Sequence, residues 1–388
     1  MNRVSYSSNH DGSSLLTVLS VILLQVSYVH LRMLLGNAGD KSFFIDFLVI
    51  VIPLLATLTL LSSHLPALAT FVFNLCLGCM TMKKLRESTS PCKQHVKDDN
   101  KTRRKSYLDL FRGSIMLMTC LCILAVDFEV FPRHLAKTET LGISLMDIGG
   151  GAIVISSALT SPEARGISPC SLKPGKNAYY LLFLGVGRVL MLHLIGYEEH
   201  TSENGVHWNF FFTLLFVQYA SQFCNWCFSS QEYRNYFLSG GAVVMLTAHQ
   251  VALSTTDLQH YILSAPRTSF ISCNREGIFS LACYLPLFIL SQNLSKTFIF
   301  TRTEAPTGSR VLGRSEPMEE ISARLRLRSA LAWVVGASAV CLVVSSRCLG
   351  APSRRLANMG FSSTLALLTS TQLWAFVSVE LFYLQGRG

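Results

Sequence analysis

Charged residues are scarce in this sequence. Asp, Glu, Lys and Arg make up only 14% of its 388 residues, whereas hydrophobic residues make up 50%. The mean hydropathy of +0.39 lies well above that of a soluble domain. Apolar runs of about 17–22 residues recur along the chain, the length that an α-helix needs to cross a bilayer. The composition excludes an ordinary soluble protein and predicts an all-α, polytopic transmembrane helical bundle.

Several catalytic motifs are also absent. The chain has no Gly-x-Ser-x-Gly elbow, no His-Glu-x-x-His and no glycine-rich phosphate loop, so neither a serine hydrolase, a zinc peptidase nor a nucleotide site is indicated. Two Cys-x-x-Cys pairs, Cys76/Cys79 and Cys224/Cys227, lie inside apolar runs without a neighbouring His or second pair. Zinc needs four donors at close quarters. We therefore expect no metal site and interpret these cysteines as small apolar residues.

The apolar runs predict about eleven spans in one membrane domain over residues 1–388. The start of the chain is polar, and the first run lacks the small-residue exit of a cleavable signal peptide. The predicted spans cover residues 14–35, 43–61, 66–82, 110–126, 141–160, 179–195, 208–228, 237–253, 278–293, 330–346 and 361–384.

The basic residues gather in loops between the spans. Loop 83–109, the loop after the fifth span and loop 296–329 fall on one side of an eleven-span topology, which the positive-inside rule makes cytosolic. Loop 196–205 has no Lys or Arg and falls opposite. The net charge of +10 is thus an orientation signal, and we expect no nucleic-acid partner. Loop 296–329, with its prolines and glycines, is expected to be disordered.

Polar clusters fall at the non-cytosolic ends of the predicted spans, at residues 127–139, 197–209, 274–277 and 354–358. Because unpaired polar groups cannot face lipid, we expect these clusters to converge into a polar cavity walled by helices. Asp127, at the end of the fourth span, is a functional candidate, since a carboxylate there needs water, a cation or a proton. The alternative is an ion pair with Lys137 or an arginine. Asp147, mid-span before three glycines, is expected to face the bundle interior.

Other members of these clusters also have plain structural interpretations. His207 and Trp208 fit interfacial anchors at the start of a span. Glu276 fits the first turn of a helix, and Arg354 and Arg355 fit contacts with headgroup phosphates. From the residues alone, chemistry on a lipid-borne substrate and transport across the membrane are both possible.

Residues 125–139, AVDFEVFPRHLAKTE, resemble the string AVDFPxFPRRFAKTE of a known family. The motifs SLMDIG (144–149), GYEEH (196–200), GVHWNFF (205–211), NREG (274–277) and RRLAN (354–358) match the same family in order and at suitable spacing. It is the inositol acyltransferase family of glycosylphosphatidylinositol (GPI) anchor biosynthesis, which includes the fungal GPI-anchored wall transfer proteins and their animal counterparts. Agreement over so many ordered motifs is highly specific.

The resemblance implies a multi-pass enzyme of the endoplasmic reticulum membrane, with its catalytic motifs toward the lumen. Members of the family are O-acyltransferases. They move a fatty acyl group, usually palmitoyl from acyl-CoA, to the inositol 2-hydroxyl of glucosaminyl-phosphatidylinositol. The implied partners are this glycolipid, palmitoyl-CoA as co-substrate and membrane lipids, and no cofactor is implied.

The resemblance assigns the catalytic pair to Asp127 and Lys137. A secondary hydroxyl needs a positioned base, which fits Asp127, and Lys137 or Arg133 would stabilise the oxyanion formed at the thioester carbonyl. Which member of the pair first takes the proton is open, because coupled groups share their titration. The candidates for substrate binding are Arg133, Asp147, His200, His207, Asn209, Asn274, Arg275, Glu276, Arg354 and Arg355.

The chain departs from the family pattern at several positions. His134 replaces an arginine, Leu135 an aromatic residue and Cys273 an alanine. The family continues for about two more spans of membrane length, so the resemblance implies that its C-terminal spans are missing here. Two alternative functions are a lipid transporter or flippase, which would show discontinuous helices and paired repeats, and a non-catalytic membrane partner of a GPI-synthesis complex.

Overall fold

The computed structural model describes residues 12–36, 42–89, 105–167, 175–196, 205–229, 233–300 and 317–385, and every regular element in these ranges is a helix. The elements are α2 (Leu15–Leu34), α3 (Ser42–Asp46), η2 (Phe47–Val51), α4 (Ile52–Leu58), η3 (Ser62–His64), α5 (Leu65–Thr89), α6 (Ser106–Ala125), η4 (Arg133–Leu135), α7 (Leu145–Leu159), α8 (Lys176–Ile195), α9 (Phe210–Cys227), α10 (Arg234–Thr255), α11 (Leu258–Ser264), α12 (Phe270–Cys273), α13 (Arg275–Leu294), η5 (Ser295–Ile299), α14 (Pro317–Cys348) and α15 (Met359–Gln385).

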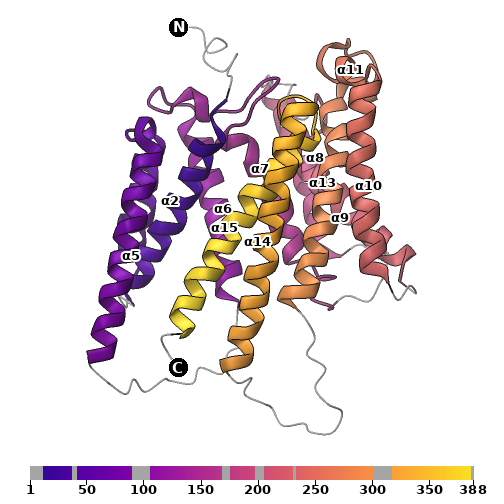
Figure 1. Ribbon diagram of the computed structural model, residues 1–388. Coiled ribbons are helices and arrows are strands. Elements are labelled where there is room, and N and C mark those ends of the chain that lie inside the picture. Colours follow the sequence, from indigo (N-terminus) through magenta and orange to yellow (C-terminus); the bar gives the residue numbers. More distant parts are fainter. Residues whose placement is uncertain are drawn as a thin grey trace.

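The long helices lie side by side along one axis, so the chain passes back and forth between two ends of the molecule (Figure 1). Helix α2 begins at the upper end in this view, and α15 ends at the lower end. The end of α5 and the start of α14 lie at the lower end, whereas the turn between α14 and α15 lies at the upper end. The start of the predicted basic loop 83–109 and the end of the predicted basic loop 296–329 therefore lie at the opposite end of the bundle from that turn.

Eight helices within the described ranges are long and apolar enough to cross a membrane. They are Leu15–Leu34, Ser62–Met82, Ser106–Ala125, Lys176–Ile195, Arg234–Thr255, Arg275–Ile299, Glu320–Cys348 and Met359–Leu384. The other three predicted spans fall on the short apolar helices Ser42–Leu58 and Leu145–Leu159 and on the 18-residue helix α9. The polytopic helical bundle is thus confirmed, while the count of eleven spans stays a prediction.

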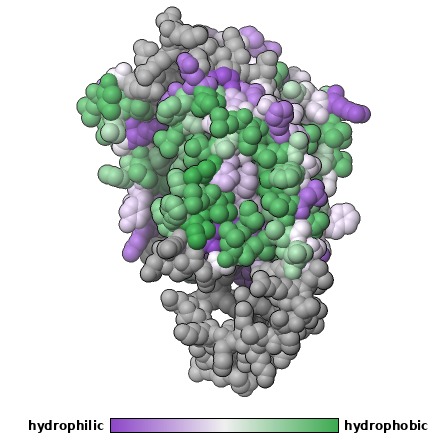
Figure 2. All heavy atoms as spheres, turned by 90° about the vertical axis from the view of Figure 1, so that its left-hand side faces the viewer, coloured by the Kyte–Doolittle hydropathy of each residue, from purple (hydrophilic) through white to green (hydrophobic). Residues whose placement is uncertain are grey.

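The outer surface of the bundle matches a lipid environment. A broad hydrophobic band covers the face shown in Figure 2, with hydrophilic residues gathered above it. Phe71 and Phe73 of α5, the helix at the left of Figure 1, are 67% and 61% exposed. Large apolar side chains exposed in this number would aggregate a protein in water but are stable against acyl chains.

The core of the bundle is built around α15, which packs against α2, α6, α7, α13 and α14. Leu365, Phe376 and Val377 of α15 are fully buried. Gly151 of α7 lies against Leu365, and any side chain at this glycine would overlap the leucine. The predicted close approach at the glycine run is therefore present at Gly151, where a Cβ atom would force the Leu365 side chain to shift.

The boundaries of two predicted loops were wrong. Within loop 296–329, α14 already begins at Pro317, and η5 continues α13 to Ile299. Proline is well suited to the first turn of a helix. Arg324, expected to be a loop charge, lies in α14 and pairs with Glu320 at 2.8 Å and with Glu380 of α15 at 2.9 Å. Loop 83–109 is likewise shorter than predicted, because α5 continues to Thr89 and α6 begins at Ser106.

Candidate functional site

The described parts of the predicted polar clusters, residues 127–139, 205–209, 274–277 and 354–358, lie at the upper end of the bundle in Figure 1. The segment that follows α6 is bonded to the turn between α14 and α15, since the Gly142 amide donates to the Pro352 carbonyl at 2.8 Å and the Ser353 hydroxyl donates to the Thr140 carbonyl. The amide of Val206 donates to the carbonyl of Cys273 at 3.0 Å. Segments far apart in sequence therefore meet at this polar end, as the sequence predicted, whereas the polar cavity stays a prediction.

Asp147 is the centre of one group of contacts at this polar end. Its carboxylate accepts hydrogen bonds from the Thr138 hydroxyl at 2.7 Å, from the Ser144 hydroxyl at 2.8 Å and from Arg354 Nε at 2.8 Å. The backbone amides of Thr138 and Ser144 also donate to it. A carboxylate has about four lone-pair sites, so protein donors occupy this one fully.

The predicted mid-span position of Asp147 was wrong, although its side chain does face the interior. Ser144 is the N-cap of α7 and forms a capping box with Asp147, which places the aspartate in the first turn. The spacing Ser144-x-x-Asp147 is a visible signal for this helix start. It was missed because the apolar run extends upstream of the cap.

Glu276 is the centre of a second group. It is 1% exposed and pairs with Arg267, with Arg355 at 3.1 Å and with Arg275 at 3.6 Å. Its place in the first turn of α13 was expected, but Arg267 was missed, because nothing in its local sequence marks it. Three guanidinium groups around one buried carboxylate replace the water that the charge has lost.

The neighbouring residues Arg354 and Arg355 point to different carboxylates. Arg354 pairs with Asp147 of α7, and Arg355 pairs with Glu276 of α13. The turn before α15 is thus joined to two helices by ion pairs. Both arginines are engaged inside the protein, which disfavours the interpretation that they only meet headgroup phosphates.

The side chains of two predicted asparagines form hydrogen bonds with backbone groups. Asn274 is fully buried, and its Oδ1 accepts from the amides of His207 at 2.8 Å and Trp208 at 3.0 Å. Asn209 caps α9 and donates from Nδ2 to the Gly185 carbonyl of α8 at 2.8 Å. The His207 side chain is exposed. Of the three residues, His207 is therefore the one whose side chain is open to a substrate.

Gly205 permits the close approach of this loop to Asn274. Its φ is +115°, and a Cβ atom there would lie 2.6 Å from the Asn274 Cα. We expect Gly205→Ala to destabilise the protein by about 2–4 kcal/mol through backbone strain and overlap. The measurement is the melting temperature of the detergent-purified chain. Gly240→Ala, in α10 with open space around it, is the control, and equal melting temperatures for both variants would contradict the expectation.

Asp127 lies in an exposed turn directly after α6. Arg133 donates to the carbonyls of Val126 at 2.8 Å and Phe128 at 3.0 Å, the residues on either side of Asp127. Arg133 therefore holds the backbone of this turn. Lys137 is half-buried. The alternative role of Asp127, an ion pair with Lys137 or an arginine, stays a prediction.

Two further histidines belong to the clusters that the sequence analysis singled out, His134 as a departure from the family pattern and His200 as a candidate for substrate binding. Desolvation lowers the pKa of His134 below its usual value, so this side chain carries less positive charge at neutral pH than the arginine of the family pattern. His200 falls in residues 197–204, outside the described residues.

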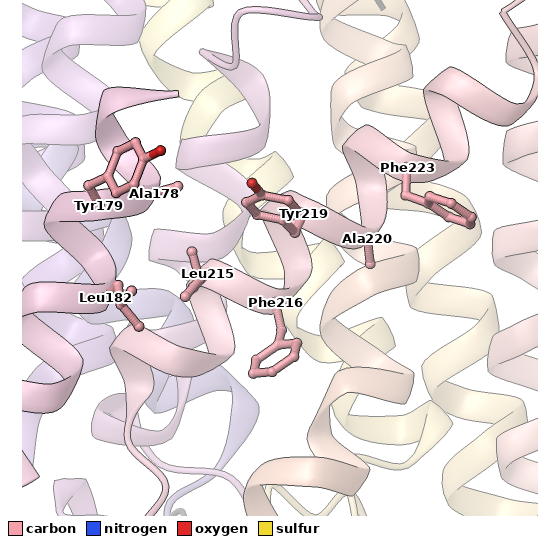
Figure 3. Close-up of a pocket in the computed structure, with 8 residues that line it drawn as sticks. All are labelled: Ala178, Tyr179, Leu182, Leu215, Phe216, Tyr219, Ala220 and Phe223. Atoms are coloured by element: carbon pink, nitrogen blue, oxygen red, sulfur yellow. The ribbon is translucent and has the colours of Figure 1, made fainter. Parts of the chain in front are cut away.

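An apolar groove of about 600 Å³ lies between α8 and α9. It is lined by Tyr179 and Leu182 of α8 and by Leu215, Phe216, Ala220 and Phe223 of α9, among others (Figure 3). Phe216 stacks on Trp208 with ring centroids 5.2 Å apart, so an aromatic contact links the groove to the loop before α9. No sequence pattern marks this groove, because an apolar lining differs little from any other membrane helix surface.

The chain is similar to known proteins along most of its length. The model of the GWT1 family matches residues 2–387 of the chain. The chain is 35% identical over 301 residues to GPI-anchored wall transfer protein 1 of Yarrowia lipolytica, over 72% of this chain and 62% of the relative. It is 34% identical to the protein of that name from Gibberella zeae, over 72% and 57%.

A more distant relative aligns over more of both chains. The phosphatidylinositol-glycan biosynthesis class W protein of Dictyostelium discoideum is 28% identical over 421 residues, which cover 94% of this chain and 80% of the relative. The alignments with the two fungal proteins thus span about three fifths of those relatives' length.

Proposed function

The chain belongs to the GWT1 family, and on this premise we propose that it acts in GPI-anchor biosynthesis as an inositol acyltransferase. It would transfer a fatty acyl group, palmitoyl by preference, from acyl-CoA to the inositol 2-hydroxyl of glucosaminyl-phosphatidylinositol in the endoplasmic reticulum membrane. The observation that carries the proposal is the convergence of the family motifs at one polar end of the bundle. A membrane enzyme acting on a lipid headgroup needs its polar residues gathered at such an end.

In the proposed reaction the inositol hydroxyl oxygen attacks the thioester carbonyl carbon. Asp127 accepts the hydroxyl proton as general base, and the Lys137 ammonium stabilises the oxyanion. The C–S bond then breaks, and the leaving CoA thiolate takes up a proton. Asp127 suits this role because its carboxylate is exposed at the polar end, and Arg133 suits a supporting role because it holds the turn on both sides of Asp127.

The acyl chain of the donor needs an apolar site next to this polar end. The groove between α8 and α9 has a suitable lining, and the stacked pair Trp208–Phe216 connects it with the loop that carries His207. The α9 part of the lining runs from Leu215 to Phe223, about 9 to 21 Å along the helix from its cap at Asn209, so it lies within the hydrocarbon thickness of a bilayer. The groove is therefore our candidate for the acyl chain.

Filling the groove should weaken binding of the acyl donor. We expect Ala220→Trp to raise the apparent KM for palmitoyl-CoA about tenfold with little change in kcat, because displacing about two methylene groups costs ~0.8 kcal/mol each. Initial rates against palmitoyl-CoA concentration measure this. Val244→Trp, on the exposed face of α10, is the control. Equal KM values for the two variants would remove the groove from the proposal.

The proposed function is tested in microsomes from cells that lack their own inositol acyltransferase and express this chain. They receive glucosaminyl-phosphatidylinositol and labelled palmitoyl-CoA. The expected product resists phosphatidylinositol-specific phospholipase C, because acylation blocks the hydroxyl that this enzyme uses. Absence of such a product from microsomes that contain the folded chain would refute the proposal and favour the role of a non-catalytic partner.

A further inference from the structure

We propose that Asp147, Arg354 and Thr138 are positioning residues that hold Lys137 in place, and that they do not contact substrate. The catalytic consequence rests on the function proposed above. The three residues form what we call the Lys137 frame. They come from three separate parts of the chain, namely the first turn of α7, the turn before α15 and the segment after α6.

Asp147 has no hydrogen-bonding capacity left for a ligand. Its side chain is completely buried, and five protein groups donate to its two oxygens: the amides and hydroxyls of Thr138 and Ser144, and Arg354 Nε. A buried carboxylate with all its lone pairs occupied cannot accept a further bond from a sugar hydroxyl without losing one. Its charge is also balanced by the Arg354 guanidinium at 2.8 Å. This ion pair is therefore a structural element of the polar end.

Thr138, the residue after Lys137, is held by the Asp147–Arg354 ion pair. Its amide and its hydroxyl both donate to Asp147, and its carbonyl accepts from Arg354 Nη2 at 3.5 Å. Each polar group of Thr138 is thus held by the ion pair. On the other side of Lys137, Ala136 is 5% exposed and packed in the core. The backbone of Lys137 is consequently anchored in both directions, while its own side chain is only half-buried.

The Lys137 frame is itself held in place by hydrogen bonds to the turn before α15. Gly142 and Thr140 bind the turn before α15, and Asn358 accepts from the Ser353 amide at 3.0 Å within that turn. A catalytic group must be held within about 0.5 Å of its working position, and a displacement of about 1 Å can cost 10²-fold in rate. The frame provides such rigidity for a residue that lies on an irregular segment.

The kinetic test compares Thr138→Val with Thr138→Ser in the full-length chain. The valine variant keeps the shape but loses the hydroxyl donor, so we expect kcat to fall about 10–100-fold with unchanged apparent KM for both substrates. The serine variant keeps the donor and should restore kcat to within about threefold. A raised KM with unchanged kcat in the valine variant would show a substrate contact instead, and wild-type kcat and KM would overturn the frame.

A second readout tests the frame without catalysis. Three variants are purified in detergent: Lys137→Cys alone, Lys137→Cys with Thr138→Val, and Lys137→Cys with Thr138→Ser. The rate at which a membrane-impermeant maleimide labels each variant is measured. Labelling of the unsubstituted chain gives the background from the native cysteines. We expect the valine background to change the labelling rate at least about threefold and the serine background to leave it unchanged. Equal rates in all three would refute the frame. If the wild-type chain lacks acyltransfer, the proposed function fails while this labelling result still decides the frame.

Discussion

Asp127→Asn should lower the rate of inositol acylation by about 10²–10⁴-fold, the usual contribution of a positioned general base. The amide is nearly the same size as the carboxylate but cannot accept the hydroxyl proton. Because Asp127 lies in an exposed turn and Arg133 bonds to the neighbouring backbone carbonyls, the fold should be unaffected. The microsome assay measures the product, and thermal melting of the purified chain measures the fold.

The matched control for this substitution lies two residues further on. Glu129 is also an exposed carboxylate in the same turn, so Glu129→Gln removes the same charge from the same region. Its rate should stay within about twofold of wild type, as for most surface substitutions. Equal losses in the two variants would point to a general charge effect at the polar end, and full activity of Asp127→Asn would remove Asp127 from the mechanism.

Glu276→Gln should cause the largest loss of stability, about 3–5 kcal/mol, the range for breaking a buried ion pair by removing one partner. Glu276 is 1% exposed and lies against the guanidinium groups of Arg267, Arg275 and Arg355. Neutralising Glu276 leaves the three guanidinium charges close together without the negative charge that balanced them. We expect a lower yield of monodisperse protein after detergent extraction and a melting temperature several degrees below wild type.

Two further variants separate the ion pairs from a general effect of substitution. Glu163→Gln changes a half-buried carboxylate with a 3.4 Å contact from Gln292 at the other end of the bundle, and we expect a change below about 1 kcal/mol. The double variant Glu276→Gln/Arg267→Gln removes one of the excess charges and should recover part of the lost stability. A melting temperature of Glu276→Gln equal to wild type would contradict the assigned role of this carboxylate.

The candidate site shows where sequence reasoning succeeded and where it did not. The convergence of residues 127–139, 274–277 and 354–358 followed from hydropathy and loop charge, because each span reverses the side on which the next loop lies. Which side faces the cytosol stays a prediction. The contacts of Asp147 and Glu276 did not follow, since Arg354 is 207 residues from Asp147 and no local pattern reports such a pairing. The catalytic roles of Asp127 and Lys137 remain proposals that rest on the resemblance.

By itself, the sequence determined the helical membrane class, the order of the motifs and the family, because hydropathy and motif spacing are properties of neighbouring residues. Only the tertiary structure decided that Arg354 and Arg355 serve different carboxylates, that Arg267 joins Glu276 and that an apolar groove lies between α8 and α9. The physical reason is that ion pairs and grooves depend on distances between side chains of different helices. Those distances are set by how the helices pack, which depends on contacts all along the chain.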